Sequence, residues 1–208
     1  MTKEYYDRYW RHELPKMSFF DNEPVWDKKT LDQYAKMLSP WLWGSTIIDY
    51  GCGQGHLLNR FAQKRWITFG VDISSVVIEN AKRTYQACNF HYPSDRIPYV
   101  ANVISTDVME HVFDFDEYFK FVRSHLKVRG RLLVVTNEMC FLKFLAIGLF
   151  FKDTFHHPYS PHIRFFTKKS LEQLLEMHGF KVIHYQSIGR YYGIGLSKGQ
   201  FVVAERVK

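Results

Sequence analysis

The feature that most constrains the fold of this chain is a glycine-rich loop between an apolar run and a helix-like segment. The apolar residues 47–48 lead to Asp49, and Gly51, Gly53 and Gly55 follow. Glycine has no Cβ and adopts positive φ readily, so the backbone of such a loop can approach a ligand closely. The helix that follows offers unpaired N–H groups at its first turn. This arrangement is typical of a site for an adenosine cofactor.

A second apolar run, residues 69–71, ends on Asp72. A carboxylate at the tip of the strand after such a loop suits hydrogen bonds to both hydroxyls of a ribose. The dinucleotide fingerprint G-x-G-x-x-G does not fit, because position 56 is His56 and the third glycine comes one residue early. The sequence also has no G-x-x-x-x-G-K-[ST] phosphate loop. The spacing therefore disfavours a dehydrogenase and a nucleoside triphosphate site.

Strand-like and helix-like segments alternate along the chain, which predicts a three-layer α/β fold around a mostly parallel sheet. Strands are expected over residues 47–50, 68–71, 86–90, 99–105, 131–136, 181–187 and 200–206. Ser74, Asp114 and Thr167 suit the N-caps of the helices that follow them. Gly179 suits the end of the last helix. No repeat or linker interrupts the sequence, so residues 1–208 are expected to form one domain.

Two long segments fall outside this alternation, residues 1–40 and residues 137–166. Connections of this length in compact domains are usually lids or binding loops. We therefore expect an N-terminal helical arm and, later, a lid or substrate insertion. The insertion contains an apolar run over residues 139–151, for which three roles stay open: closing a pocket, contacting a membrane or partner subunit, or ordinary burial.

Composition places the chain among globular proteins. Its residues are 46% hydrophobic, and the run over 139–151 is far shorter than the ~20 residues that span a bilayer. The first residues are charged and aromatic, so no signal peptide is expected. The three cysteines form no C-x-x-C pair and suit a reducing compartment, so we expect a cytoplasmic protein. The basic residues behind the net charge of +7 are scattered, so we expect no nucleic-acid partner.

Four segments resemble class I S-adenosylmethionine (SAM)-dependent methyltransferases. Residues 47–58 resemble motif I of that family, and residues 104–112, 126–135 and 162–180 are similar to its later segments, in family order. The likeness is to the small-molecule branch that includes quinone O-methyltransferases. It implies a Rossmann-like methyltransferase fold, with a mostly parallel seven-stranded sheet and a C-terminal antiparallel hairpin. It also implies SAM as cofactor and S-adenosyl-L-homocysteine (SAH) as product.

The resemblance implies roles for residues around the loop. Asp49 would lie near the methionine part of SAM or brace the loop. Gly51 and Gly53 would lie against SAM, and Asp72 would bind its ribose. Residues 106–107 would border the sulfonium and the acceptor. The complete expected cofactor set is Tyr6, Trp10, Asp49, Gly51, Cys52, Gly53, Gly55, His56, Asp72, Ile73, Ser94, Asp95, Thr106 and Asp107.

Adenine recognition departs from the family pattern. The acid that relatives place against the adenine amino group falls on Pro93 in this sequence. Asp95 would take its place, with the Ser94 backbone N–H as the other contact. In the arm, Tyr6 and Trp10 are four residues apart and share a helix face, from which they would cover SAM or pack on the core. An aromatic face attracts a sulfonium as it attracts other cations.

Histidines supply the expected catalytic residues, His111 and His157. Imidazole has a suitable pKa for a general base. A structural role is the alternative for His111, and His156 and His162 are further candidates in the insertion. No metal site is expected, because no acidic or cysteine partner lies at convincing spacing from the His-His pair.

The sequence therefore predicts a SAM-dependent methyltransferase that acts on a small, apolar or amphipathic acceptor, at oxygen. The net charge of +7 leaves methylation of RNA or protein as an alternative. A SAM-binding protein without transferase activity is a second alternative, because the adenine segment departs from its family. The sequence carries no signal for the oligomeric state.

Overall fold

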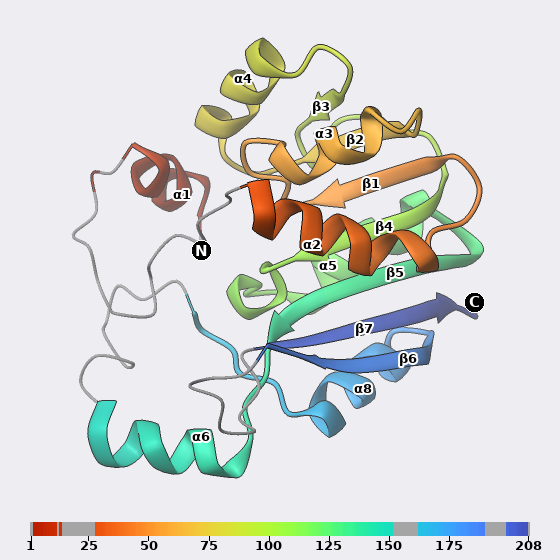
Figure 1. Ribbon diagram of the computed structural model, residues 1–208. Helices are drawn as coiled ribbons and strands as arrows, with labels where there is room; N and C mark the ends of the chain where they lie inside the picture. The colour runs from red at the N-terminus through yellow and green to blue at the C-terminus, as the bar shows by residue number, and fades with distance from the viewer. Residues whose placement is uncertain (1, 12, 14–27, 152–161, 190–198, 208) are drawn as a thin grey trace.

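The computed structural model describes residues 2–11, 13, 28–151, 162–189 and 199–207, and it is built around a seven-stranded sheet (Figure 1). The strands are β1 (Thr46–Tyr50), β2 (Ile67–Val71), β3 (Asn89–His91), β4 (Val100–Thr106), β5 (Leu126–Asn137), β6 (Phe180–Ile188) and β7 (Gly199–Arg206). Their order across the sheet is β3-β2-β1-β4-β5-β7-β6. Strands β1 to β5 pair in parallel, whereas β7 is antiparallel to both of its neighbours.

Helices cover both faces of this sheet. They are α1 (Lys3–Trp10), α2 (Lys28–Leu38), α3 (His56–Ala62), α4 (Ser75–Thr84), α5 (Phe115–His125), α6 (Phe141–Ala146) and α8 (Lys168–Met177). Short helical turns are η1 (Ser39–Trp41), η2 (Met109–His111) and η3 (Ile147–Phe151). Figure 1 shows α2 and α3 in front of the sheet and α5 behind it.

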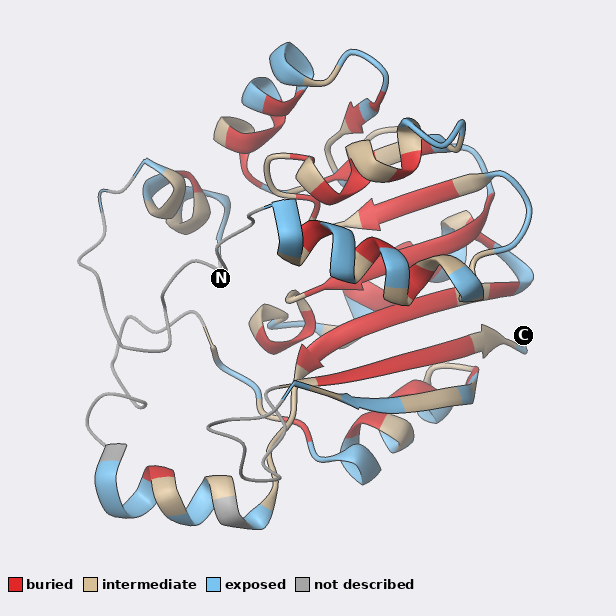
Figure 2. Cartoon of the chain, in the orientation of Figure 1, coloured by how far each residue is buried: buried red, intermediate tan, exposed pale blue. Residues whose placement is uncertain are grey.

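The sheet is buried on both faces because neighbouring apolar residues on a strand point in opposite directions. Ile47 packs in the cluster formed with α2 and α3, whereas the adjacent Ile48 packs in the cluster formed with α5 and α8. Leu133 and Leu132 divide in the same way on β5. Figure 2 shows the resulting continuous burial of the central strands. The near-continuous apolar strands of the sequence are thus explained by a three-layer sandwich.

The fold class predicted from the sequence is confirmed, including the antiparallel arrangement of the last two strands. Most strand boundaries lie within one residue of the expected ones, and two starts differ by more. The third strand starts at Asn89 rather than at residue 86, and β5 begins at Leu126. The pairing of β4 with β5 shifts register between Val100 and Asn102, where Arg129 adopts a φ of 63°. The predicted strand over 131–136 is therefore only the regular part of a longer, interrupted one.

All three expected residues occupy N-cap positions, and two of them cap with their side chains. The side chains of Asp114 and Thr167 accept hydrogen bonds from the first turns of α5 and α8. Ser74 precedes α4 as its N-cap, but its side chain makes no capping bond and donates instead to Asp7 Oδ1, 2.6 Å away. An aspartate from another helix thus takes over the capping of α4.

The insertion after β5 forms α6 and η3, which Figure 1 shows standing off from the sheet. Several of its apolar side chains are largely exposed: Phe141, Phe144, Leu149 and Phe150. Figure 2 shows the same exposure along this segment. Among the residues that the structure describes, no helix is both long and apolar enough to cross a membrane.

Candidate functional site

A cavity of about 2070 Å³ opens at the carboxyl ends of the parallel strands. Its wall combines the loops after β1, β2, β4 and β5 with side chains from α1 and α2. Ligands of open α/β sheets bind at this edge, next to the point where the strand order reverses. Small-molecule pockets are commonly ~300–1,000 Å³. The cavity is therefore large enough for two ligands side by side.

The glycine loop forms one wall of the cavity and is tied to the end of β2. The backbone N–H groups of Gly51 and Cys52 both donate to the Val71 carbonyl oxygen, at 2.7 and 3.0 Å. Gly51 has a φ of 78°, and a Cβ there would overlap Val108 Cγ2 on the neighbouring loop. Glycine is thus required at this position by the contact between the two loops as well as by the backbone conformation.

Asp72 closes the loop from the tip of β2. Its Oδ2 accepts from the Gly53 N–H at 3.0 Å, and its Oδ1 accepts from the Ser74 N–H at 2.9 Å. Burial raises the pKa of Asp72, although both backbone donors favour its ionised form. The carboxylate is therefore held in a fixed orientation on the cavity wall.

Asp49 lies at the end of β1, beneath the loop, and is only 2% exposed. Its Oδ1 has no hydrogen-bond partner among the described residues. Burial, followed by the charge of Asp72, raises the pKa of Asp49 to about 7. A buried carboxylate oxygen without a partner is costly, so this atom is an acceptor that a cationic ligand group could satisfy.

Helix α1 covers the loop from the other side. Tyr6 and Trp10 both line the cavity, and the Trp10 ring would be 3.6 Å from a Cβ placed on Gly53. Asp7, on an adjacent face of the same helix, anchors α1 to α4. It accepts from the hydroxyls of Ser74 and Ser75 at 2.6 and 3.0 Å.

The same carboxylate of Asp7 also accepts from the Val76 N–H at 3.3 Å and from Lys3 Nζ at 2.8 Å. Burial opposes its ionisation, but the hydrogen bonds from Lys3 and the two serines outweigh that cost. They hold the pKa of Asp7 well below its ordinary value. Sequence reasoning missed this residue, because its partners on α4 lie 67 to 69 positions away and no local pattern marks them.

The second half of the cavity lies beyond β4. Asp107 adopts a φ of 55°, and its N–H donates to the Val135 carbonyl oxygen at 2.9 Å. Tyr34, from α2, donates its hydroxyl to Asp107 Oδ2 at 3.4 Å. Burial and then the charge of Glu110 raise the pKa of Asp107. An L-residue held at positive φ between two elements suggests a constrained, functional position.

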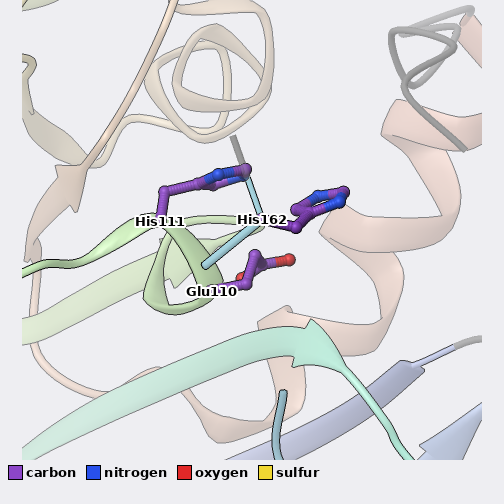
Figure 3. A group of neighbouring side chains, drawn as sticks. All are labelled: Glu110, His111 and His162. Carbon is purple, nitrogen blue, oxygen red and sulfur yellow. The ribbon is translucent and has the colours of Figure 1, made fainter. Parts of the chain in front are cut away.

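Glu110, His111 and His162 come together in this half (Figure 3). One ligating atom from each lies within 4.8 Å of the other two. The imidazole rings stack at 4.8 Å between centroids, with 25° between their planes. Burial and then the charges of His111 and Lys143 lower the pKa of His162 to about 3, which keeps this imidazole neutral.

Backbone contacts hold this group in place. The Glu110 carbonyl oxygen accepts from the N–H groups of Ile163 and Arg164 at 3.0 and 3.1 Å, which ties the segment of His162 to η2. Thr136 Oγ1 donates to Glu110 Oε2 at 2.7 Å. Sequence reasoning named His111 and His162 separately but missed Glu110, because 52 positions separate it from His162.

Residues 2–185 match the model of a family described as a methyltransferase domain. This match covers most of the chain and includes the glycine loop, Asp72 and the group in Figure 3. The chain belongs to this methyltransferase family. The family is SAM-dependent, so the cofactor predicted from the sequence is confirmed as SAM.

Relatives and solved structures agree with this assignment. The chain is similar to the mitochondrial ubiquinone biosynthesis O-methyltransferases of Bos taurus and Homo sapiens, at 25% identity over 156 residues and 26% over 158. These alignments cover 67% and 68% of this chain but 42% of each relative's length. Magnesium protoporphyrin IX methyltransferase from Synechocystis PCC 6803, with bound SAH, has a TM-score of 0.71 at 18% identity. That match covers 98% of this chain and 97% of the other.

The residues of the methyltransferase cavity fit SAM. Its sulfonium and its amino group are cationic, and Asp49, Asp72 and Asp107 all contribute to the wall. Both Asp49, whose Oδ1 has no hydrogen-bond partner among the described residues, and Asp72, which holds the Gly53 N–H, line the cavity beside the glycine loop. Bound SAM would supply a methyl group on a positively charged sulfur, already activated for displacement.

Most of the predicted cofactor residues lie on this wall: Tyr6, Trp10, Asp49, Gly51, Cys52, Gly53, His56, Asp72, Ile73, Ser94, Thr106 and Asp107. The wall made by the described residues does not include Gly55 or Asp95. Gly55 instead precedes α3 as its N-cap, with a φ of 79°. Asp95 Oδ2 accepts from the Tyr92 N–H at 2.9 Å, in a turn beside the cavity.

The predicted catalytic residues divide in the same way. His111 lines the cavity, whereas His157 lies outside the described residues. Cys52 is buried, and burial raises the pKa of its thiol, which disfavours the reactive thiolate. His56 Nδ1 is 2.7 Å from the Tyr85 hydroxyl, so its ring is oriented by that contact.

Proposed function

We propose that this protein transfers the methyl group of SAM to an oxygen atom of a small, apolar or amphipathic acceptor. The observation that carries this proposal is the continuity of one large cavity from the glycine loop to the group of Glu110, His111 and His162. SAM occupies the loop side in this account, and the acceptor occupies the side beyond Asp107. Such placement aligns sulfur, methyl and acceptor, and positioning can contribute several kcal/mol, up to roughly 7–11 in favourable models.

On the cofactor side, we propose that Asp72 binds the ribose and that Asp49 faces the amino group of the methionine part. The Asp72 carboxylate has two oxygens at a fixed orientation, which suits the two hydroxyls of a ribose. Tyr6 and Trp10 cover the same half, where their rings attract the sulfonium. Ser94 and Ile73 lie on the wall where the adenine is placed.

On the acceptor side, the wall is largely apolar. It includes Met37, Val112, Phe113, Met139, Phe165 and Ile188. An apolar wall with a few polar groups at one point is the usual form of a site for an apolar small molecule. The likeness to two ubiquinone biosynthesis O-methyltransferases supports an apolar acceptor and oxygen as the methylated atom.

Methylation at oxygen requires the acceptor hydroxyl to lose a proton. We place this step at Glu110, His111 and His162, because they bring two imidazoles and a carboxylate together on the cavity wall. The oxygen then forms its bond to the methyl carbon as the bond from that carbon to sulfur breaks, and SAH leaves. Removing one such proton-handling group commonly costs about 10²–10⁴-fold in rate.

The proposal is tested by methyl transfer from radiolabelled SAM to an alkyl catechol, an alkyl aniline and unsubstituted catechol. We expect the alkyl catechol to be methylated at oxygen, and catechol without the alkyl chain to react less efficiently. Transfer to the aniline nitrogen alone would overturn the choice of oxygen. Binding of SAM without turnover of any acceptor class would favour a non-catalytic SAM-binding protein.

Methylation of RNA remains the second candidate, because the chain carries a net charge of +7. RNA binding through phosphate contacts weakens steeply as salt rises. Turnover of an RNA substrate that falls steeply between 50 and 200 mM salt would support this candidate. Salt-insensitive methylation of the alkyl catechol would oppose it. We also propose a cytoplasmic location, supported by free thiols at Cys52, Cys88 and Cys140.

A further inference from the structure

The group in Figure 3 combines two imidazoles and one carboxylate at the wall of the acceptor half. We propose that Glu110, His111 and His162 bind a divalent transition-metal ion, which activates the acceptor hydroxyl. This inference rests on the proposed O-methylation for its catalytic role, although ion binding itself does not depend on it. It departs from the sequence expectation that the protein has no metal site.

The geometry of the three side chains supports a shared ion. Their ligating atoms lie within 4.8 Å of one another, whereas two ligands on one metal ion, at bonds of about 2.0–2.2 Å, are about 3–4 Å apart. An imidazole nitrogen binds a metal ion in the plane of its ring, so closing this difference requires the two imidazoles to rotate out of their stacked arrangement. The three residues come from η2 and from the segment before α8, which the Glu110 carbonyl already joins through two backbone hydrogen bonds.

The surroundings resemble those of metal ligands in other proteins. Metal-binding carboxylates are usually oriented by a second hydrogen bond, and Thr136 Oγ1 donates to Glu110 Oε2 at 2.7 Å. Glu110 is 3% exposed, so its carboxylate is largely removed from water. Asp107 lies on the same wall and adds negative charge. Lys143 also lines the cavity, with its Nζ donating to the Glu138 carbonyl oxygen at 2.9 Å, so a bound ion shares the wall with this positive charge.

The ligand set indicates the kind of ion. Two imidazoles and one carboxylate suit Zn²⁺ and other first-row transition metals, whereas Mg²⁺ prefers oxygen ligands. Such a site keeps coordination positions open for a substrate oxygen. A hydroxyl bound to the ion loses its proton to solvent more readily, and the resulting oxygen attacks the methyl group of SAM as the bond from that group to sulfur breaks. In this account His111 acts as a ligand rather than as a free base.

Titration calorimetry of the untagged, chelator-treated protein with Zn²⁺, Co²⁺ and Mg²⁺ tests the site. We expect one transition-metal ion per chain, bound at least tenfold more tightly than Mg²⁺. The variants Glu110→Gln, His111→Ala and His162→Ala should each weaken Zn²⁺ binding by at least tenfold. His125→Ala is the matched control, because His125 contacts the Phe121 carbonyl oxygen on α5 and does not line the cavity. Equal affinity in all four variants would overturn the proposal, as would the absence of binding to the native protein.

X-ray absorption of the native protein loaded with one equivalent of Zn²⁺ covers the case in which a variant fails to fold. We expect a signal for two imidazoles, and one or none would contradict the site. SAH titration and methyl transfer with and without chelator separate this inference from the proposed function. Full transfer activity in the chelated protein would refute the catalytic role of the ion but leave O-methylation standing. Loss of SAH binding would instead remove the proposed function.

Discussion

Replacing Asp7 by alanine should release helix α1 from the rest of the protein while the sheet stays folded. The carboxylate accepts hydrogen bonds from Ser74 Oγ, Ser75 Oγ and the Val76 N–H, and it pairs with Lys3. A hydrogen bond to a charged group contributes about 1.5–3 kcal/mol. The Lys3 side chain is 47% exposed, so solvent screens its pairing with Asp7 and the pair adds little.

Water replaces part of these contacts at the edge of α4, so we expect a net loss of about 2–4 kcal/mol in the docking of α1. This corresponds to about 30- to 1000-fold in the docking equilibrium, because 1.4 kcal/mol is a factor of ten. Tyr6 and Trp10 line the cavity from α1, so the apparent affinity for SAH falls with the docked fraction. We expect SAH to bind Asp7→Ala at least about tenfold more weakly than the native protein.

Two assays read this release, calorimetric titration with SAH and tryptic cleavage after Arg8. Arg8 lies on the exposed side of α1, and trypsin reaches its peptide bond only when the helix opens. Glu4→Ala is the matched control, because Glu4 is an exposed acid on the same helix. Equal cleavage rates and equal SAH affinities for Asp7→Ala and Glu4→Ala would refute the anchoring role of Asp7.

Acid should release α1 in the native protein, because the pKa of Asp7 is lower in the folded protein than its ordinary value of 3.8. Docking is therefore complete above pH 3.8 and is lost as the pH falls below it. Tryptophan fluorescence of the native protein, compared with Asp7→Ala, measures this release. The affinity for SAM should rise as pH increases through about 7, because Asp49 ionises there beside the cationic ligand. Calorimetric titration should show that Asp49→Asn flattens this rise. A native affinity profile without a step near pH 7 would contradict the placement of Asp49 against the amino group of SAM. Because the pKa of Asp49 is raised in the folded protein, its contribution to stability is complete below pH 3.8 and is lost as pH rises through about 7. In chemical denaturation, the free energy of unfolding of Asp49→Asn should therefore fall less between pH 3.8 and about 7 than that of the native protein. Gly51→Ala should lower the melting temperature and weaken SAH binding, because the added Cβ overlaps Val108. The additional change Val108→Ala should restore part of both the melting temperature and the affinity. If neither is restored, the backbone conformation alone requires the glycine.

The part of the site that follows from local pattern was predictable from the sequence. An apolar run that ends on an acid, a glycine loop and a second acid lie within 26 residues, and the structure places Asp49, Gly53 and Asp72 on one wall as expected. The three layers were also predictable from local pattern, because strand-like and helix-like segments alternate along the chain. Periodicity reports which faces are buried, and burial on both faces defines a central parallel sheet.

The rest depends on contacts between distant residues. Asp7 caps α4 across 67 to 69 positions, and Glu110 meets His162 only because β5 and the insertion return the chain to η2. The reason for Gly51 is also non-local, since the side chain that excludes a Cβ belongs to Val108. Asp95 has the residue type expected for adenine binding, but its carboxylate is used within its own turn. No window of sequence contains both members of these pairs.

Titration of the protein with SAH in a calorimeter tests the central claim most directly, with Asp72→Asn as the variant. The native protein should bind one SAH per chain. Asp72→Asn keeps one acceptor oxygen for the loop but loses the charge that holds the ribose. Two charge-assisted hydrogen bonds, at about 1.5–3 kcal/mol each, predict an affinity at least tenfold weaker. Unchanged affinity in a folded Asp72→Asn protein, or no SAH binding to the native protein, would contradict this account of the site.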